Sequence, residues 1–210
     1  MENRTQVEKP SCAHLAPKVN SGSCGHHHAE TVTALLSDEH RVIERVLVGL
    51  EQLTSRPIKG SFESWKKALD FIRHFADQCH HYKEEKVLFP AMEEHGIPSD
   101  GGPVGMMLIE HEEGRSYVRG MAAALAQIEE GDSSAANALF ENAKNYLRLL
   151  REHIQKEDDI LFPMADQALG AAEQQRMLMA FAEHEASEMG AGVHEKYLSI
   201  AEELASAANG

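Results

Sequence analysis

The sequence predicts an all-α protein, an up-down-up-down four-helix bundle with an additional C-terminal helix and an irregular N-terminal tail. Leu, Ala, Met, Glu, Lys and Gln are plentiful and β-branched residues are sparse, which favours helix. Long stretches with helical periodicity are separated by short segments that contain Gly and Pro. Because short connections between long helices favour antiparallel neighbours, these stretches are expected to form a bundle.

The first part of the chain holds the tail and two predicted helices. Residues 1–28 show poor periodicity and contain helix-breaking Pro and Gly, so an irregular, flexible tail is expected. A first helix is expected over residues 31–54. A second is expected over residues 62–94, with Ser61 as its N-terminal cap and apolar residues along one side.

The remainder of the chain holds three further predicted helices. The third is expected over residues 104–130, after a loop rich in Gly and Pro. The fourth is expected over residues 135–169, with a cap from Asp132 or Ser133. Residues 171–207 are expected to form a fifth helix, in which two Gly residues near position 190 are candidate breaks.

These elements divide the chain into three parts. The Cys- and His-containing tail occupies residues 1–28, and the four-helix bundle occupies residues 29–169. A C-terminal helical extension, residues 170–210, is expected to pack on the bundle. The chain has 210 residues, which is enough for one bundle with a sizeable core and a small appendage.

The charge balance disfavours two classes of partner. The formal net charge is −14 at pH 7, whereas nucleic acids and anionic membranes attract basic surfaces. No apolar run approaches the roughly 20 residues that span a bilayer, and the polar N-terminus shows no signal-peptide core. We therefore expect a cytoplasmic protein that binds neither nucleic acid nor membrane.

An internal repeat carries the functional prediction. Residues 80–90 read HHYKEEKVLFP and residues 153–163 read HIQKEDDILFP, so the two copies share the first His, the Lys, the Glu and the final Leu-Phe-Pro. A weaker echo relates the Glu-His pair at 39–40 to the pair at 110–111. The bundle is therefore interpreted as two helical hairpins, each with an early His and a late His-x-x-x-Glu.

The repeat selects a set of candidate metal ligands. Residues four apart share one face of a helix, but six of the 13 His have Glu at that spacing, so the spacing alone is weak evidence. The register of Leu-Phe-Pro selects His80 with Glu84 and His153 with Glu157. At about 1.5 Å per residue, these pairs and the two His of the Glu-His echo lie about 10–18 Å from the same end of the bundle. The predicted ligands are His40, His80, Glu84, His111, His153 and Glu157.

Imidazole and carboxylate donors together suit iron, manganese or zinc. Two helical carboxylates can bridge two ions, and each ion then keeps coordination positions open for water or a small ligand. We therefore predict a pair of iron ions, bridged by an oxo or hydroxo group, with manganese or zinc as alternatives. Catalytic residues and sites for other cofactors are not assigned.

The pattern resembles the hemerythrin-like family of HHE cation-binding domains over about residues 31–168. The resemblance implies a four-helix bundle with a non-haem di-iron centre that binds or reacts with oxygen, nitric oxide or peroxide; some members serve iron sensing or repair of damaged iron centres. Oxygen-carrying hemerythrins have His-x-x-x-His on the third ligand helix, whereas here the fourth residue after His111 is Arg115. A carrier role is therefore disfavoured.

Two functions remain open on these grounds. The first is a di-iron protein that binds or consumes a small oxidant in oxidative or nitrosative stress defence or in iron homeostasis. The alternative is a non-enzymatic iron or oxygen sensor, or a metal store, that signals to a partner. A third hypothesis, with less support from the residues, is a purely structural metal site, for example for zinc. The electron donor, protein partner and oligomeric state are not predicted.

Some histidines and cysteines fall outside the predicted ligand set. His81 and Glu85 are expected to form a neighbouring polar face. His184 and Glu188 lie on the predicted fifth helix, where structural hydrogen bonding is expected. The tail repeats a short Cys and His unit and is interpreted as a segment with incidental metal affinity, with metal delivery or redox sensing as the alternative; the residues concerned are Cys12, His14, Cys24 and His26.

Overall fold

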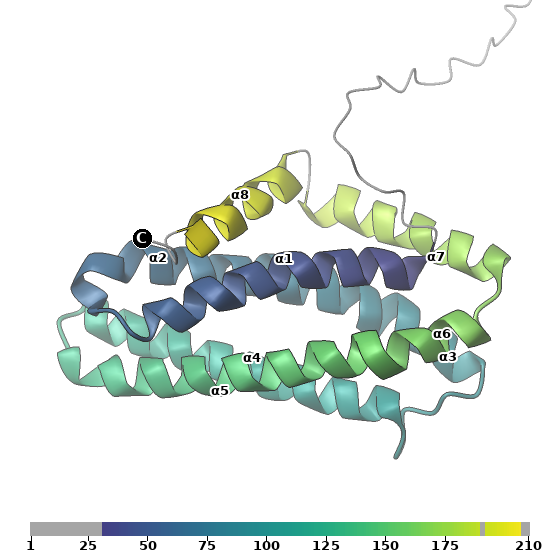
Figure 1. Ribbon diagram of the computed structural model, residues 1–210, viewed down its shortest axis with the longest axis horizontal. Coiled ribbons are helices and arrows are strands. Elements are labelled where there is room, and N and C mark those ends of the chain that lie inside the picture. The colour runs from purple at the N-terminus through teal and green to yellow at the C-terminus, as the bar shows by residue number, and fades with distance from the viewer. Residues whose placement is uncertain (1–30, 190–191, 207–210) are drawn as a thin grey trace, which may run out of the picture.

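The computed structural model describes residues 31–189 and 192–206, and these residues form helices joined by turns, with no strand among them. Long helical segments lie side by side, with α7 and α8 placed over one side of them (Figure 1). The predicted all-α bundle is confirmed. None of the described helices combines the length and the apolar character needed to span a lipid bilayer.

The first two helical segments begin close to turns that the sequence marks. Helix α1 spans Val32–Leu53, and the Thr31 hydroxyl accepts a hydrogen bond from the Ala34 amide at its start. The second segment begins at Ile58, earlier than predicted, because Pro57 occupies the N-cap position with extended backbone. Ser61 lies inside the first turn and donates its hydroxyl to the Pro57 carbonyl oxygen, so Ser61 is not the cap.

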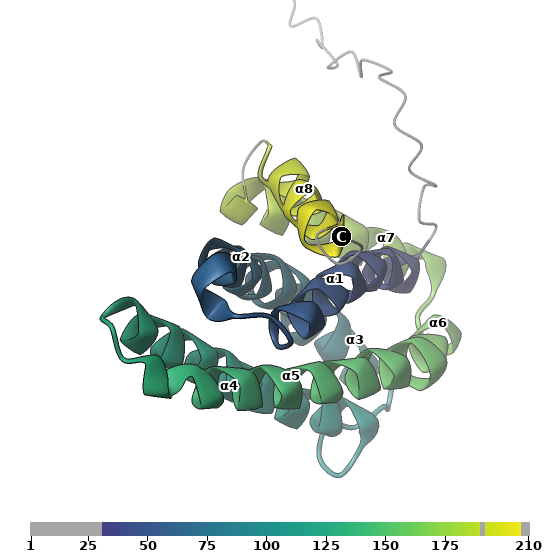
Figure 2. The same cartoon turned by 60° about the vertical axis from the view of Figure 1, so that its left-hand side comes forward.

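The second segment is one long helix with changes of winding. It comprises α2 (Ile58–Phe71), the π-helices η1 (Ile72–His81) and η2 (Glu84–Leu88), and α3 (Phe89–Glu94). A loop then leads to α4 (Pro103–Glu129). Figure 2 shows this segment and α4 beside the remaining long helices.

The fourth segment has the same changes of winding near its end. It comprises the 3-10 turn η3 (Ser133–Ala135), α5 (Ala136–Lys156), the π-helix η4 (Glu157–Leu161) and α6 (Phe162–Ala168). The Asp132 carboxylate accepts a hydrogen bond from the Ser134 amide, so the predicted cap lies at the start of this segment.

The two copies of the repeat share a π-helical turn, which begins at the Glu of each His-x-x-x-Glu motif. The Phe89 amide donates to the Glu84 carbonyl, and the Phe162 amide donates to the Glu157 carbonyl, five residues back in each copy. A proline follows each Phe and has no amide hydrogen to donate, which favours a change of hydrogen-bond register there. Short π-helical turns are rare and occur frequently at functional sites.

The C-terminal extension is two helical segments, in line with the candidate breaks in the fifth helix expected over residues 171–207. Helix α7 (Ala171–His184) runs into the π-helix η5 (Glu185–Met189), and α8 (Val193–Ser206) follows. Gly192 precedes α8 with φ of +84°, a conformation that most other residues adopt at a cost. Helix α8 packs on α1 and α2, while α7 lies near the start of α1 (Figures 1 and 2).

The apolar core has two parts. One cluster of buried side chains includes Leu47, Phe75 and Leu150, and the other includes Leu36, Leu88 and Phe162. On each of the four long segments, buried polar residues lie between positions that belong to the two clusters. The bundle thus places a polar level between two apolar regions that exclude water.

Gly49 lies where α1 meets α8. A Cβ atom at this position would lie 2.8 Å from the Leu204 Cβ atom and 2.9 Å from the Leu204 carbonyl oxygen. We expect Gly49→Ala to lower the free energy of unfolding by roughly 1–3 kcal/mol, because α8 must move away from α1. Urea denaturation of the two proteins measures this change.

Gly60→Ala is the matched control. Gly60 is also inside a helix, but a Cβ atom there would meet nothing within 4 Å. Alanine should therefore raise the free energy of unfolding by up to about 1 kcal/mol through its higher helix propensity. Equal shifts in both variants would contradict the close packing of α8 on α1.

Candidate metal centre

All six predicted ligand side chains meet inside the bundle, and we call them the polar layer. Helices α1 and α4 each contribute one His, and each copy of the repeat contributes one His and one Glu. Each side chain comes from a residue that is at most 1% exposed. The members of the polar layer are His40, His80, Glu84, His111, His153 and Glu157.

Each carboxylate of the polar layer faces imidazoles from different helices. The Glu84 oxygens lie 3.4 Å from His80 Nε2 and 3.5 Å from His111 Nε2. One Glu157 oxygen lies 3.3 Å from His40 Nε2 and 3.2 Å from His153 Nε2, while the other lies 4.0 Å from His111 Nε2. Both carboxylates therefore lie between imidazoles, as bridging ligands would.

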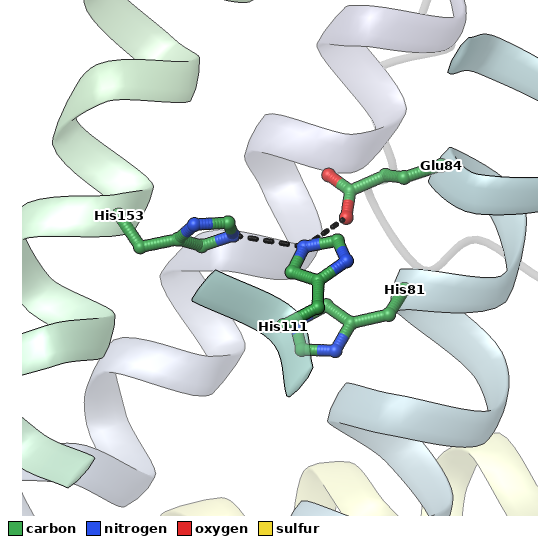
Figure 3. Close-up of side chains that lie close together, drawn as sticks. All are labelled: His81, Glu84, His111 and His153. Atoms are coloured by element: carbon green, nitrogen blue, oxygen red, sulfur yellow. Dashed lines mark hydrogen bonds and ion pairs between the residues drawn. The ribbon is translucent and has the colours of Figure 1, made fainter. Parts of the chain in front are cut away.

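Two imidazoles also turn their Nε2 atoms toward each other. His111 Nε2 and His153 Nε2 are 3.0 Å apart, with Glu84 beside them (Figure 3). Adjacent ligands of one ion at metal–nitrogen distances of about 2.1 Å are separated by about 3 Å. The spacing of this pair therefore suits two ligands of a single ion.

Several buried polar atoms of the layer lack a hydrogen bond. Within the described part of the chain, no hydrogen bond reaches either carboxylate oxygen of Glu84 or Glu157, or Nε2 of His40. A buried carboxylate without a partner costs several kcal/mol, which a bound cation offsets. These orphaned atoms and the mixed donor set fit a pair of metal cations.

The donor atoms form two overlapping groups. His40, His80, Glu84 and Glu157 make up one group, within which the ligand atoms all lie within 4.8 Å of one another. Glu84 also belongs to a second group, whose ligand atoms likewise all lie within 4.8 Å of one another. Its other members are His81, His111 and His153. Two groups with a shared carboxylate are the arrangement expected of two neighbouring ions.

A second set of carboxylates surrounds the polar layer, and we call these residues the outer carboxylates. Each accepts a hydrogen bond from Nδ1 of one layer histidine at 2.8–3.0 Å, which leaves Nε2 directed inward. Such bonds fix the ring orientation and the tautomer of metal-binding histidines. The pairs are His40 with Asp158, His80 with Glu39, His111 with Glu85, and His153 with Glu110.

These outer carboxylates were not predicted as part of the site, although the repeat contained the signal. Glu39 and Glu110 directly precede the histidines of α1 and α4, and Glu85 and Asp158 directly follow the two layer glutamates. The prediction that Glu85 belongs to a neighbouring polar face understated its role, because Glu85 holds His111. The periodicity shows helical faces, but it does not show which helix a side chain reaches.

Each outer carboxylate is paired with a basic side chain. Arg115 donates to Glu85 at 2.6 Å, and Arg41 and Lys156 pair with Asp158 and Glu110. The fourth base differs, because Lys83 is fully buried and pairs with both Glu39 and Glu185 of η5. The C-terminal extension thus contributes a charge to one side of the centre only.

The other predicted positions have separate outcomes. His184 donates Nε2–H to the Gln78 carbonyl at 2.9 Å and stacks on Tyr82, which is the structural hydrogen bonding that was expected. The Glu188 side chain and the tail residues Cys12, His14, Cys24 and His26 lie outside the described part. His81 differs from expectation, since it is buried and stacks on His111.

Opposing effects set the pKa values in the centre. Burial lowers the pKa of His80, but the Glu84 and Glu39 carboxylates outweigh burial and raise it to about 10. Burial also lowers the pKa of His153, and the Glu157 and Glu110 carboxylates raise it to about 10. Protons on these two imidazoles therefore balance the carboxylates at neutral pH when no metal is bound.

The family comparison covers the bundle. The model of the hemerythrin HHE cation-binding domain matches residues 31–165, a range that includes the whole polar layer. Similar proteins include an uncharacterised protein of Mycobacterium bovis and two of Mycobacterium tuberculosis strains, each 25% identical over 159 residues. These matches cover 74% of this chain and 61% of each relative, so the chain spans less than two thirds of the relatives' length.

The raised pKa values predict how the metal-free protein responds to alkali. A histidine whose pKa is higher in the folded state stabilises the fold below its unfolded value, 6.5, and that contribution is lost as pH rises toward about 10. We expect the urea midpoint of chelator-treated protein to fall between about pH 7.5 and about pH 9.

Metal-loaded protein is the control for this experiment. Metal ions replace the protons on ligand groups, so the loaded protein should lack the alkaline decline. A urea midpoint that stays constant or rises over this window in the metal-free protein would contradict the assigned charge state of His80 and His153.

Proposed function

This chain belongs to the hemerythrin HHE cation-binding domain family, and from that premise we propose that its polar layer holds a pair of iron ions. One observation carries the proposal. The four oxygens of Glu84 and Glu157 are buried, make no hydrogen bond within the described chain, and face imidazole nitrogens from four helical segments. Buried carboxylates of this kind need positive charge beside them, and the mixed donor set suits metal cations in that role.

The distances support a division of the ligands. In the proposed centre, His40 and His80 bind one ion and His111 and His153 bind the other, while Glu84 and Glu157 bridge the two. Imidazole and carboxylate together suit iron, with manganese or zinc as alternatives. Two imidazoles and two carboxylate oxygens leave open positions on an ion that accepts six ligands, as reactive centres require.

We further propose that the open positions take a small oxidant, namely oxygen, peroxide or nitric oxide. An iron pair supplies electrons and binding positions for such molecules. The chain's own residues orient the ring nitrogens through the outer carboxylates and exclude bulk water through the two apolar clusters. A cavity of about 160 Å³, bounded by Asp77, His81, Arg115 and Tyr146 among others, provides space for small molecules beside the layer.

This chemistry suits defence against oxidative or nitrosative stress, or iron homeostasis, and an oxidoreductase that consumes peroxide or nitric oxide is one form of it. The net charge of −14 disfavours nucleic acid or an anionic membrane as a partner. The polar layer lies deep within the bundle, which suits a small ligand better than a bulky substrate.

The alternative proposal is a sensor or metal store that signals to a partner without turnover. The buried ion pair that joins Lys83 to Glu39 and Glu185 favours it. Because Glu39 also holds His80, three successive contacts connect that histidine to Glu185 of the C-terminal extension. A metal-dependent change in the proteolytic sensitivity of α7, with no oxidant turnover, would favour this function.

Iron loading of the full chain tests the main proposal. Anaerobically loaded protein should bind two iron ions per chain, and addition of oxygen, peroxide or nitric oxide should change its absorption spectrum. His80→Ala and His153→Ala should each lose metal, since each removes one imidazole and leaves a carboxylate less well paired. Metal analysis by mass spectrometry and optical titration provide the measurements.

His95→Ala is the control, because His95 lies outside the polar layer and pairs with Glu173. This variant should keep both ions. Retention of two ions per chain by both His80→Ala and His153→Ala would overturn the ligand assignment, and a spectrum unaffected by all three oxidants would exclude the oxidant-binding function.

A further inference from the structure

We propose that His81 is a third imidazole ligand of the ion held by His111 and His153, so that the two halves of the metal centre are chemically unequal. This inference rests on the metal pair proposed above. It adds an imidazole from the first copy of the repeat to the half of the centre whose other imidazoles come from α4 and the second copy.

The position of His81 places its ring against this half of the centre. The His81 ring stacks on the His111 ring, with 3.9 Å between centroids and 14° between planes (Figure 3). The ligand atoms of His81, Glu84, His111 and His153 all lie within 4.8 Å of one another. Opposite ligands of one ion are about 4 Å apart, so a contraction of less than about 1 Å brings these donors to bonding positions.

The winding of η1 explains how two consecutive histidines both face inward. Consecutive residues of an α-helix point about 100° apart. A π-helix has more residues in each turn, so neighbouring side chains diverge less. His80 and His81 end the π-helix η1, and the first reaches toward Glu84 and His40 while the second reaches His111. Each thus serves a different ion.

His81 also has the hydrogen-bond pattern of the proposed ligands. All four layer histidines direct Nδ1 to a carboxylate, and His81 directs Nδ1 to Asp77 at 3.4 Å. Arg115 in turn binds Asp77 at 2.8 Å, as basic side chains bind the outer carboxylates. His95, in contrast, engages both ring nitrogens, with the Ala91 carbonyl and Glu173, and leaves no nitrogen for an ion.

The cavity beside His81 gives the ring room to move out of its stack. His81 lines the cavity of about 160 Å³ together with Gly114 and Tyr146. Two imidazoles on one ion cannot keep a face-to-face stack, because both nitrogens must point at the same centre. A tilt of His81 toward the ion is therefore required, and neighbouring empty space makes that tilt sterically accessible.

The repeat makes this donor specific to one half. The position that corresponds to His81 in the second copy is Ile154, a buried member of the larger apolar cluster. The ion of His40 and His80 therefore has two imidazoles, and the ion of His111 and His153 has three. We expect the second ion to bind more tightly and to keep fewer open positions.

A Co²⁺ titration of the full metal-free chain tests the proposal. Wild-type protein should bind two Co²⁺ in two resolvable steps. Ligand-field absorption and metal analysis monitor the binding. His81→Ala should weaken one step by at least about 100-fold and change its absorption band, because loss of a direct ligand exceeds the 10–100-fold effect of outer contacts. The other step should stay within about twofold of wild type.

His81→Phe separates ligation from packing, since a phenyl ring can stack on His111 but has no nitrogen to donate. It should weaken the same step as His81→Ala. His74→Ala is the control, because the His74 side chain is 43% exposed and lies outside the layer, so both steps should persist. Circular dichroism verifies that each metal-free variant is folded, and His81→Gln replaces any variant that is not.

The outcomes are distinct. Two unchanged steps in His81→Phe would overturn the proposal and assign His81 a packing role. Two unchanged steps in His81→Ala or His81→Gln would overturn it as well. Failure of the wild-type chain to bind two Co²⁺ would instead count against the metal pair itself.

Discussion

The burial of Glu84 and Glu157 among four imidazoles is the constraint on which the rest of the structure depends. Two carboxylates removed from water cost several kcal/mol each unless opposite charge is placed beside them. The surrounding charges alternate outward from this point: imidazoles, then the outer carboxylates, then Lys and Arg. Each level compensates the one inside it, and metal ions or protons complete the innermost level.

The bundle keeps this charged level at the junction of two apolar clusters, where water is excluded from both sides. Low local polarity strengthens every ion pair in the level, and it also raises the cost of leaving one unmade. The π-helical turns at Glu84 and Glu157 are part of this arrangement, since they set the angle at which each repeat presents its ligands. The same local change of winding therefore recurs at equivalent places in both halves.

The two halves are related by the repeat, yet they are not equivalent. Lys83 is fully buried beneath the C-terminal extension and shares Glu185 of η5, whereas the matching Lys156 has a side chain that is 36% exposed. His81 faces the centre, whereas its counterpart Ile154 belongs to the apolar core. The duplicated scaffold thus provides different environments for its two proposed ions, and the C-terminal extension contributes Glu185 to one of them.

Much of the structure could be predicted from the pattern of residues. Helical periodicity located the bundle helices, and the Leu-Phe-Pro register together with the common depth of the four helical positions selected the six side chains that meet in the polar layer. The earlier start of the second segment at Ile58 was not predicted, because propensity defines boundaries weakly. The π-helical turns were not predicted either, because a shift in backbone hydrogen bonding depends on neighbouring helices as well as on Pro90 and Pro163.

The sequence by itself determined which residues share a helical face and which positions correspond in the two copies, because both follow from spacing along one helix. Only the tertiary structure decided that Glu39 reaches His80, that Glu185 reaches Lys83 and that His81 stacks on His111. Those contacts join residues of different helices, and their partners depend on how the helices rotate and cross. Spacing along the chain carries no record of that rotation, whereas burial of the charged layer leaves few rotations that satisfy every partner.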